Sequence, residues 1–471
     1  MGRRRGSLAS SVLLAASIFE AGVPLVRNIV LARLMIPSEF GLAITLAVVI
    51  SLVEILTDLG IPILALRRLN GIGARETLAT LHSLALARSL LIGLFLIATA
   101  PLIARSLHVP AATWAFAALG AVAALRGFEN LGVKSMLRAN QFSPEASVIA
   151  VSQVALLVVT VAAAWWTGRY DCILWGMLAQ TIAVVGLSHV VSPRRWRLGF
   201  NRVVIKEALR FGRPLLIGGA AASVATSDRL IVGAVLGPAA IAVYNVAVGS
   251  AMLPRSVMAR FVTSALVPLF SRKSMHADKA APLADAWAFG LSCTALVYGL
   301  AIALAGGPVL GAVFGPVYQP SQLFMTILGL AVCIRILMLL PVPPSLARGD
   351  ASLVTLASIA PAIAVLLATP ILIVSRDPSS FLLTSSIVEL LALFWLTRKI
   401  AVRLSFSPAP LRLLAVGPPV TLTVLVIATL LAPDNSTSYA VIICSVALVI
   451  VTGAYLTIHR RYGIQLSAAL P

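Results

Sequence analysis

The sequence predicts an all-α polytopic membrane protein with about 14 transmembrane helices, and two observations lead to this fold class. Apolar residues make up 60% of the 471 residues and charged residues 11%, whereas charged residues are about a quarter of a soluble globular domain. Apolar stretches of roughly 20 residues, the length that one helix needs to cross a bilayer, recur from end to end. No segment between them is long enough for a soluble domain.

The first apolar stretch resembles a signal sequence but is interpreted as a retained helix. Arg3 to Arg5 precede an apolar run that continues to Arg27 without a convincing cleavage site. The other stretches are assigned by length and hydrophobicity. In order, helices are predicted over residues 8–33, 40–66, 77–104, 111–133, 145–167, 171–191, 208–235, 239–267, 285–305, 320–345, 351–374, 379–400, 411–432 and 437–458.

Positive charge collects in alternate gaps between these helices. Of the 36 Lys and Arg residues, 23 fall in gaps on the side of the N-terminus and four in the other gaps. Cytoplasmic loops carry this excess of Lys and Arg, so both termini are predicted to be cytoplasmic. Most of the residues that give the chain its net charge of +20 are then predicted to face a cytoplasmic lipid surface. A nucleic-acid partner is therefore not expected. The four residues on the opposite side are Arg33, Arg105, Arg169 and Arg376.

The chain also resembles itself. LGAVAALR (119–126) matches LGLAVCIR (328–335), and NIVLARLMIP (28–37) matches RLIVGAVLGP (229–238), at offsets of 209 and 201 residues. This offset spans six helices, an even number, so the repeats are predicted to be parallel and related by an axis along the membrane normal. The predicted organisation is an N-terminal six-helix lobe (1–191), a basic cytoplasmic linker (192–207), a C-terminal six-helix lobe (208–404), and two further helices with a tail (405–471).

Ionisable residues at membrane depth predict a central cavity between the two lobes. Each would cost about 2.5–3.5 kcal/mol at a helix centre that faces lipid, so these groups are expected to face partners or water. They concentrate in corresponding helices of the two halves, whereas helices 13 and 14 are apolar. The basic residues are Arg27, Arg88, Arg126, Arg210, Arg213, Arg229, Arg255, Arg260 and Arg335, and the acidic ones include Glu20, Glu54, Asp58, Glu129, Asp228 and Glu389.

Structural roles compete with functional ones for these residues. Glu54 and Asp58 share a helix face, Arg126 and Glu129 are spaced to neutralise each other, and Glu389 is interpreted as a structural polar contact. The residues selected as candidates for substrate binding are Arg27, Arg126, Arg229 and Arg335. Those selected for ion coupling are Asp58, Asp228 and Glu54.

Cofactor and enzyme chemistry find little support in the sequence. It contains no phosphate loop, zinc motif or nucleophile elbow, so no cofactor, metal site or ATP-driven pump is predicted. The external gap 306–320 is the longest and has no charge, which leaves little room for a catalytic loop. The four cysteines lie far apart and are expected to be core residues rather than a disulfide or metal site. They are Cys172, Cys293, Cys333 and Cys444.

Four stretches resemble a polysaccharide (O-antigen type) flippase of the multidrug/oligosaccharidyl-lipid/polysaccharide (MOP) exporter superfamily. They follow the family's patterns R-xL-xP-xxFG, D-xG-xxxA, D-xxIG-xLG-xxxxYxxA and FG-xxY. The family usually has a glycine before the tyrosine of the third pattern, here Tyr244, where this chain has Ala240, Ile241 and Ala242. The stretches are RNIVLARLMIPSEFGLA (27–43), ILTDLGIPILALRR (55–68), DRLIVGAVLGPAAIAVYNVA (228–247) and VLGAVFGPVYQPS (309–321).

The resemblance implies transport of polyprenyl-diphosphate-linked oligosaccharide to the outer leaflet of the bacterial inner membrane by alternating access, for cell-surface polysaccharide biosynthesis. Polysaccharide polymerase and chain-length proteins are implied as partners. Arginine suits a diphosphate because its planar guanidinium binds phosphate oxygens bidentately. The polyprenyl tail is expected to remain in lipid. An inside-negative potential favours outward movement of an anion by about 2.3 kcal/mol per charge per 100 mV.

Two other functions remain as alternatives. A multidrug extruder of the same superfamily would bind organic cations, which an acidic cavity favours and an arginine-lined cavity repels. Arginines outnumber carboxylates among the intramembrane residues, which disfavours that alternative. A membrane polysaccharide polymerase or ligase would need a sizeable external loop with catalytic groups. The uncharged segment 306–320 does not provide one.

Overall fold

The computed structural model is helical, as the sequence predicts, and no strand is present in the part of the chain that it describes. The predicted helices 411–432 and 437–458 lie outside this part. Within it, eight helices are long and apolar enough to cross a membrane, or nine if the bent pair Pro110–Arg126 and Leu131–Leu137 makes one crossing. The number 14 therefore stays a prediction. The described residues are 19–20, 22–68, 73–138, 141–262, 277–340, 342–347 and 352–404.

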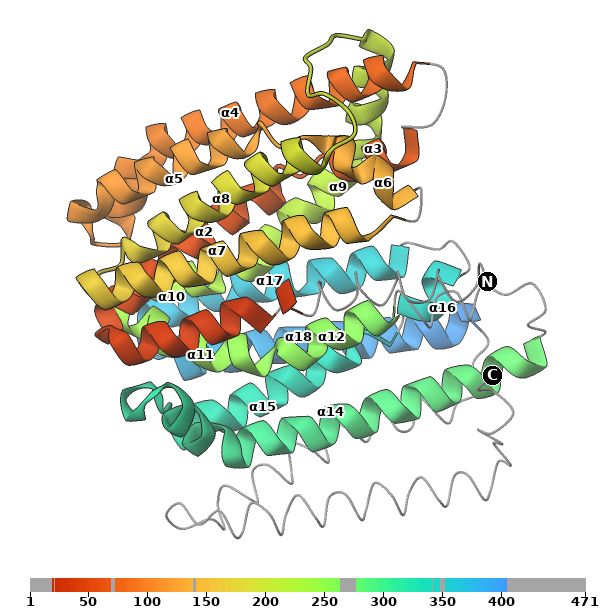
Figure 1. The fold of residues 1–471 in the computed structure, drawn as a ribbon. Helices are drawn as coiled ribbons and strands as arrows, with labels where there is room; N and C mark the ends of the chain where they lie inside the picture. Colours follow the sequence, from red (N-terminus) through yellow and green to blue (C-terminus); the bar gives the residue numbers. More distant parts are fainter. Residues whose placement is uncertain are drawn as a thin grey trace. The chain divides into compact units, whose positions relative to one another are not determined.

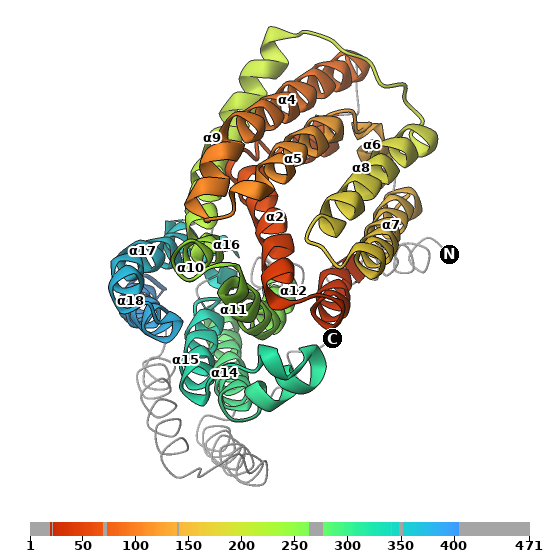
Figure 2. The same ribbon diagram turned by 90° about the vertical axis from the view of Figure 1, so that its left-hand side faces the viewer.

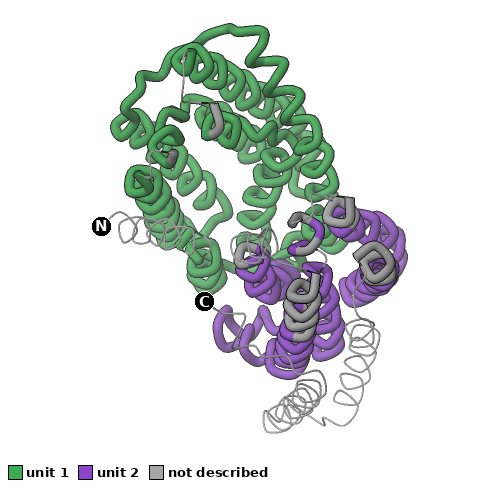
Figure 3. Tube along the Cα trace, turned by 90° about the vertical axis from the view of Figure 1, so that its right-hand side faces the viewer, with its two compact units in different colours: residues 1–242 green, residues 243–471 purple. Residues whose placement is uncertain are grey.

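The chain divides into two compact units, Met1–Ala242 and Val243–Pro471, which Figure 3 shows in different colours. Helix α11 (Pro238–Ala251) spans the division. Unit 1 contains a helix over residues 22–34 followed by α2 (Pro37–Leu56), α3 (Ile61–Arg68), α4 (Ala74–Ser106), η1 (Pro110–Ala112), α5 (Thr113–Arg126), η2 (Leu131–Val133), α6 (Lys134–Arg138), α7 (Ser143–Thr167), α8 (Cys172–Val191), α9 (Arg202–Thr226) and α10 (Asp228–Leu236). Unit 2 contains α12 (Leu253–Phe261), α14 (Ala277–Phe314), η4 (Pro316–Tyr318), α15 (Gln322–Leu337), α16 (Val342–Ala347), α17 (Ser352–Ser375) and α18 (Pro378–Leu404).

Helices α9 and α10 pack against α2 inside unit 1. Ser223 on α9 donates its hydroxyl to the carbonyl of Leu52 at 3.1 Å, and Gly219 allows the backbone of α9 to approach Ile55. The predicted lobe boundary at the linker 192–207 stays a prediction. In the structure, the compact unit continues past this linker because α9 and α10 share their packing with α2.

Each unit contains a closely packed helix pair that is centred on two glycines. In unit 1, α4 lies beside α5 (Figures 1 and 2), and a Cβ on Gly120 would lie 2.5 Å from the carbonyl oxygen of Gly93. In unit 2, α14 packs on α15, and a Cβ on Gly299 would lie 2.8 Å from the carbonyl oxygen of Gly329. Gly120 and Gly329 occupy the same place in the two matched segments LGAVAALR and LGLAVCIR. The repeated motif therefore makes the same type of helix contact twice.

The predicted helix over 40–66 is wrong in one respect, because the structure breaks it into α2 and α3. Asp58 accepts a hydrogen bond from the N–H of Gly60 at 2.9 Å, a turn that competes with the helix. Gly60 has a φ of +63°, which glycine adopts without steric cost. Pro62 follows at the second position of α3, where proline is tolerated because no intrahelical N–H bond is lost.

The predicted external gap 306–320 is also shorter than expected. Helix α14 continues to Phe314, so only the turn around η4 separates it from α15. Gly307 and Gly311 therefore lie within a helix, where small residues leave room for the side chain of Gln319, which a Cβ on Gly311 would meet at 3.0 Å.

Replacing Gly120 with alanine tests the glycine contact between α4 and α5. Relative to Gly186→Ala, we expect Gly120→Ala to lower the free energy of unfolding by about 1–3 kcal/mol, the usual cost of overpacking. Gly186 on α8 is the matched control, because a Cβ there meets nothing within 4 Å and both variants gain the same helix propensity. The measurement is denaturant or thermal unfolding of the purified protein in detergent. Equal stability of the two variants would contradict the packing argument.

Candidate functional site

Unit 1 contains a pocket of about 350 Å³ between α2, α3, α4 and α5. Three of the predicted site residues, Glu54, Asp58 and Arg126, lie in its wall. These three residues lie close together because α2 and α5 both end beside the pocket and α3 begins there. The full lining consists of Ser51, Glu54, Ile55, Asp58, Ile61, Pro62, Ala85, Arg88, Ser89, Ile92, Ala123, Arg126, Glu129 and Leu131.

Arg88 on α4 holds the end of α2. Its Nε atom donates to the carbonyl of Thr57 at 2.7 Å, and a terminal nitrogen donates to the carbonyl of Glu54 at 2.8 Å. The last carbonyls of a helix have no partner within the helix, and at membrane depth an unsatisfied one costs several kcal/mol. A cation at this end also interacts favourably with the helix dipole. The arginine therefore stabilises the break between α2 and α3.

Arg126, at the end of α5, is paired only loosely. Its guanidinium lies 3.6 Å from Glu54 Oε1, and the two side chains are 46% and 34% exposed. The ion pair of Arg126 is thus made with Glu54 on another helix, whereas no ion pair with Glu129, three residues further on, is present, although Glu129 lines the same pocket. Contact across helices wins because the chain turns out of the helix after Arg126. The Arg126 side chain is accessible from the pocket.

The pocket has more acidic than basic groups. Glu54, Asp58 and Glu129 give three carboxylates, against two guanidinium groups on Arg88 and Arg126. The intramembrane arginines outnumber the carboxylates over the whole sequence, but this pocket has the opposite balance. The donors of Arg88 are already bonded to backbone carbonyls, so Arg126 is the guanidinium in this pocket best placed to contact a ligand.

The remaining candidates in unit 1 lie outside this pocket. Arg27 is 8% exposed and donates to the side-chain oxygen of its neighbour Asn28 at 3.3 Å. Asp228 is 4% exposed, and its carboxylate accepts a hydrogen bond from the backbone N–H of Arg229 at the start of α10. The structure therefore does not bring Arg27, Asp228 and Arg229 to the pocket of Arg126. Their predicted roles stay predictions.

Arg335 in unit 2 has a different environment from its sequence counterpart Arg126. It contacts Glu389 on α18 at 2.9 Å, with the two side chains 13% and 0% exposed. Its Nε atom also donates to this carboxylate, and Arg255 donates to the Arg335 carbonyl at 3.0 Å. The structural contact expected of Glu389 is therefore confirmed, with Arg335 as its partner.

The described residues contain no group of three or more His, Cys, Asp or Glu side chains placed to hold a metal ion. Cys172 and Cys333 are buried, Cys293 is partly buried, and all three are free thiols. Cys444 lies outside the described residues. The expectation of core cysteines holds for Cys172 and Cys333.

Sequence reasoning missed two features of unit 1. It counted Arg88 among the intramembrane charges but did not assign it to the end of α2. The available signal was Asp58 followed by Gly60 and Pro62, which marks a break that leaves carbonyls without partners. It also treated the arginines of the linker 192–207 as topology signals alone, although three of them line a second pocket.

Comparisons with known proteins identify the family of the chain. A family model described as polysaccharide biosynthesis protein matches residues 30–322, which is more than half of the chain. The chain belongs to this family. No curated protein sequence matches it.

Three solved structures define the fold. The chain is similar to the lipid II flippase MurJ in an inward closed conformation, with a TM-score of 0.71, 12% identity, and coverage of 95% of this chain and 99% of that one. An inward-facing multidrug resistance MATE transporter of the MOP superfamily gives 0.57, 14%, 83% and 98%. A MOP superfamily transporter from Pyrococcus furiosus, described as having a binding pocket of reversed polarity, gives 0.56, 14%, 84% and 95%. The predicted fold is thus confirmed by these structures, and the link to polysaccharide biosynthesis is confirmed by the family model.

Breaking the buried ion pair of unit 2 should destabilise the protein. We expect Arg335→Ala to lower the free energy of unfolding by about 3–5 kcal/mol, because it leaves the Glu389 carboxylate buried without its counter-charge. The double variant Arg335→Met with Glu389→Leu removes both charges and should recover most of the loss. Unfolding of the purified protein measures both. A single variant as stable as the wild type would contradict a structural role for the pair.

Proposed function

We propose that this protein is a flippase that moves polyprenyl-diphosphate-linked oligosaccharide from the cytoplasmic to the outer leaflet of the bacterial inner membrane by alternating access. The family of polysaccharide biosynthesis proteins and the fold shared with MurJ support a membrane transporter for glycan assembly. The observation that carries the finer proposal is the accessible guanidinium of Arg126 in a membrane-depth pocket.

Arg126 has the properties that binding of a diphosphate requires. At 3.6 Å its ion pair with Glu54 is long, whereas charge-assisted hydrogen bonds measure about 2.7–2.9 Å. Diphosphate oxygens offer several acceptors in the geometry that a guanidinium binds bidentately. A diphosphate therefore competes effectively with Glu54 for this side chain. In the low-dielectric interior, such a contact replaces hydrogen bonds that the headgroup loses when it leaves water.

Displacement of Glu54 links substrate binding to ion movement in this proposal. When a diphosphate binds the guanidinium of Arg126, the Glu54 carboxylate loses its counter-charge. Glu54 then lies in one pocket with two further carboxylates, Asp58 and Glu129. Three carboxylates in one pocket at membrane depth repel one another, and a proton or a sodium ion would relieve this repulsion. Glu54 is therefore the preferred coupling residue. Asp58 is second, because its carboxylate already accepts the N–H of Gly60.

One observation favours a second candidate function, export of organic cations. The pocket has three carboxylates and two guanidinium groups. One of the guanidinium groups, that of Arg88, already donates to a backbone carbonyl at the end of α2. A cation-binding pocket needs such an acidic excess. The fold is also shared with MATE multidrug transporters, so the fold does not discriminate between the two functions.

Substitution of Arg126 tests the flippase proposal. We expect Arg126→Ala to reduce surface polysaccharide at least about tenfold, because a hydrogen bond to a charged group contributes roughly 1.5–3 kcal/mol. Arg126→Lys should retain part of the activity, since it keeps the charge but loses the bidentate geometry. The control is Arg105→Ala, in the last turn of α4, which does not line the pocket and should behave as wild type. Normal polysaccharide in Arg126→Ala at matched protein level would remove Arg126 from the site.

Deletion of the gene distinguishes the two functions. For a flippase, lipid-linked glycan should accumulate on the cytoplasmic leaflet, because synthesis continues while translocation stops. This is measured by extracting the lipid and testing its access to an external glycosidase in right-side-out vesicles. For a cation extruder, the deletion strain should instead become sensitive to ethidium with normal surface glycan. That second outcome would overturn the flippase proposal.

A further inference from the structure

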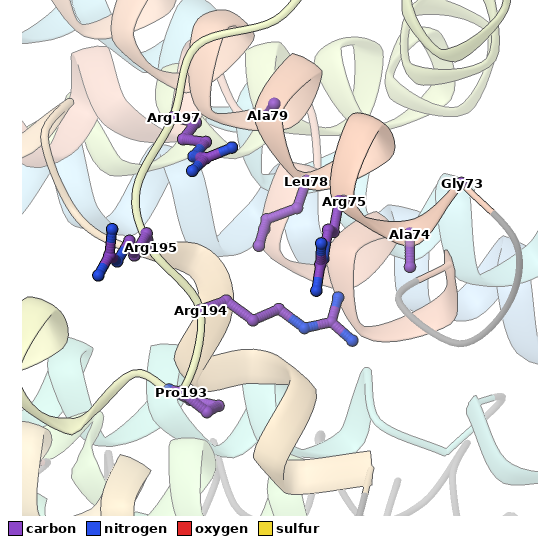
Figure 4. Close-up of a pocket in the computed structure, with 9 residues that line it drawn as sticks. All are labelled: Gly73, Ala74, Arg75, Leu78, Ala79, Pro193, Arg194, Arg195 and Arg197. Atoms are coloured by element: carbon purple, nitrogen blue, oxygen red, sulfur yellow. The ribbon is translucent and has the colours of Figure 1, made fainter.

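Unit 1 contains a second pocket, of about 720 Å³, where the start of α4 meets the linker residues 193–197 (Figure 4). Four of its lining residues are arginines, namely Arg75 on α4 and Arg194, Arg195 and Arg197 on the linker, and none is acidic. In Figure 4 the side chain of Arg194 extends from the linker toward Arg75. The pocket therefore concentrates positive charge, in contrast to the acid-rich pocket around Arg126.

The linker that carries three of these arginines is held in place by its backbone. Asn130 donates its side-chain amide to the carbonyl of Arg194 at 2.8 Å. The His82 ring accepts the N–H of Leu131 through Nε2 at 3.1 Å. Its Nδ1 therefore carries the proton and donates to the carbonyl of Arg197 at 3.2 Å. The arginine side chains thus project from a fixed scaffold rather than from a loose loop.

An aromatic cluster anchors the middle of the same linker. Trp196, between Arg195 and Arg197, lies with its ring centroid 5.8 Å from that of His82 and 5.8 Å from that of Phe128. Aromatic contacts of this type stabilise by about 0.5–1.5 kcal/mol beyond their buried area. A linker needed only to connect two helices does not require such anchoring. Its rigidity reduces the entropy cost of holding several cationic side chains around one ligand.

The start of α4 adds to the positive potential of this pocket. Gly73 precedes the helix with a φ of +88° and has no side chain with which to cap the first N–H groups. Gly73, Ala74 and Arg75 all line the pocket, so the positive end of a 33-residue helix adjoins it. Backbone N–H groups at this position bind anions. The nearby carboxylate of Glu76 accepts a hydrogen bond from Asn201 at 2.9 Å.

We propose that this pocket binds the phosphate groups of a lipid headgroup at the cytoplasmic surface. The pocket volume lies within the range of small-ligand sites, about 300–1,000 Å³. Four guanidinium groups suit a phosphate-containing anion, because its several oxygens accept hydrogen bonds from more than one arginine. The positive-inside pattern puts this end of unit 1 on the cytoplasmic side, where anionic lipids attract basic segments. Two headgroups share this chemistry, the diphosphate of a polyprenyl-linked glycan and the phosphodiester of phosphatidylglycerol.

The test is titration calorimetry on the purified full-length protein in uncharged detergent at low salt. The probes are inorganic pyrophosphate, farnesyl diphosphate and dihexanoyl phosphatidylglycerol. All proteins carry Arg126→Ala, so that the other pocket does not contribute its guanidinium. The pocket variant is Arg75→Gln with Arg194→Gln. The matched control is Arg202→Gln with Lys206→Gln, which removes the same charge from exposed positions at the start of α9 that do not line the pocket.

We expect the pocket variant to bind at least one probe about tenfold more weakly or worse, because each lost arginine removes a charge-assisted hydrogen bond, while the control changes little. Weakening for the two diphosphates alone assigns the site to the lipid-linked substrate. Weakening for phosphatidylglycerol alone assigns it to the membrane lipid, and weakening for all three shows a general phosphate site. Equal weakening in pocket and control variants, or no binding of any probe, overturns the proposal. Binding requires no transport, so failure of the flippase proposal leaves this result unaffected.

Discussion

Satisfaction of polar groups at membrane depth is the constraint on which the rest of unit 1 depends. The chain breaks a transmembrane helix after Leu56, and this exposes carbonyls that lipid cannot solvate. Arg88 supplies their hydrogen bonds from the neighbouring helix. Without such a partner the break would be too costly to persist. With it, the two helix ends separate enough to leave a charged pocket beside Arg126.

The two halves of the chain reuse one motif for different purposes. In both, a glycine permits close helix contact and an arginine follows six residues later. Arg335 meets a fully buried carboxylate at 2.9 Å, whereas Arg126 meets a partly exposed one at 3.6 Å. The partner comes from α18 in one unit and from α2 in the other. The arginine of this motif is thus part of a buried ion pair in unit 2 and an accessible cation in unit 1.

The two pockets of unit 1 have opposite electrostatic character, and this difference suits successive steps of the flippase cycle that we propose. The lining of the pocket at the linker has four arginines and no carboxylate, which favours the anionic lipid headgroup that we propose for it. The pocket at Arg126 has competing carboxylates, which keep the affinity for an anion moderate. The proposed flippase would need this restraint, because a substrate that is bound too tightly at membrane depth is not released.

The sequence by itself determined the helical class, the positions of most of the long apolar helices that the structure describes, and the family. These properties depend on composition, on apolar runs of bilayer length and on short ordered motifs, all of which are local along the chain. It also identified the charged residues at membrane depth. Only the tertiary structure decided their partners, because each contact is made by residues far apart in the chain. Glu54 rather than Glu129 faces Arg126, Glu389 holds Arg335, and Arg75 joins the linker arginines. Helix packing sets these distances, and spacing along one helix does not.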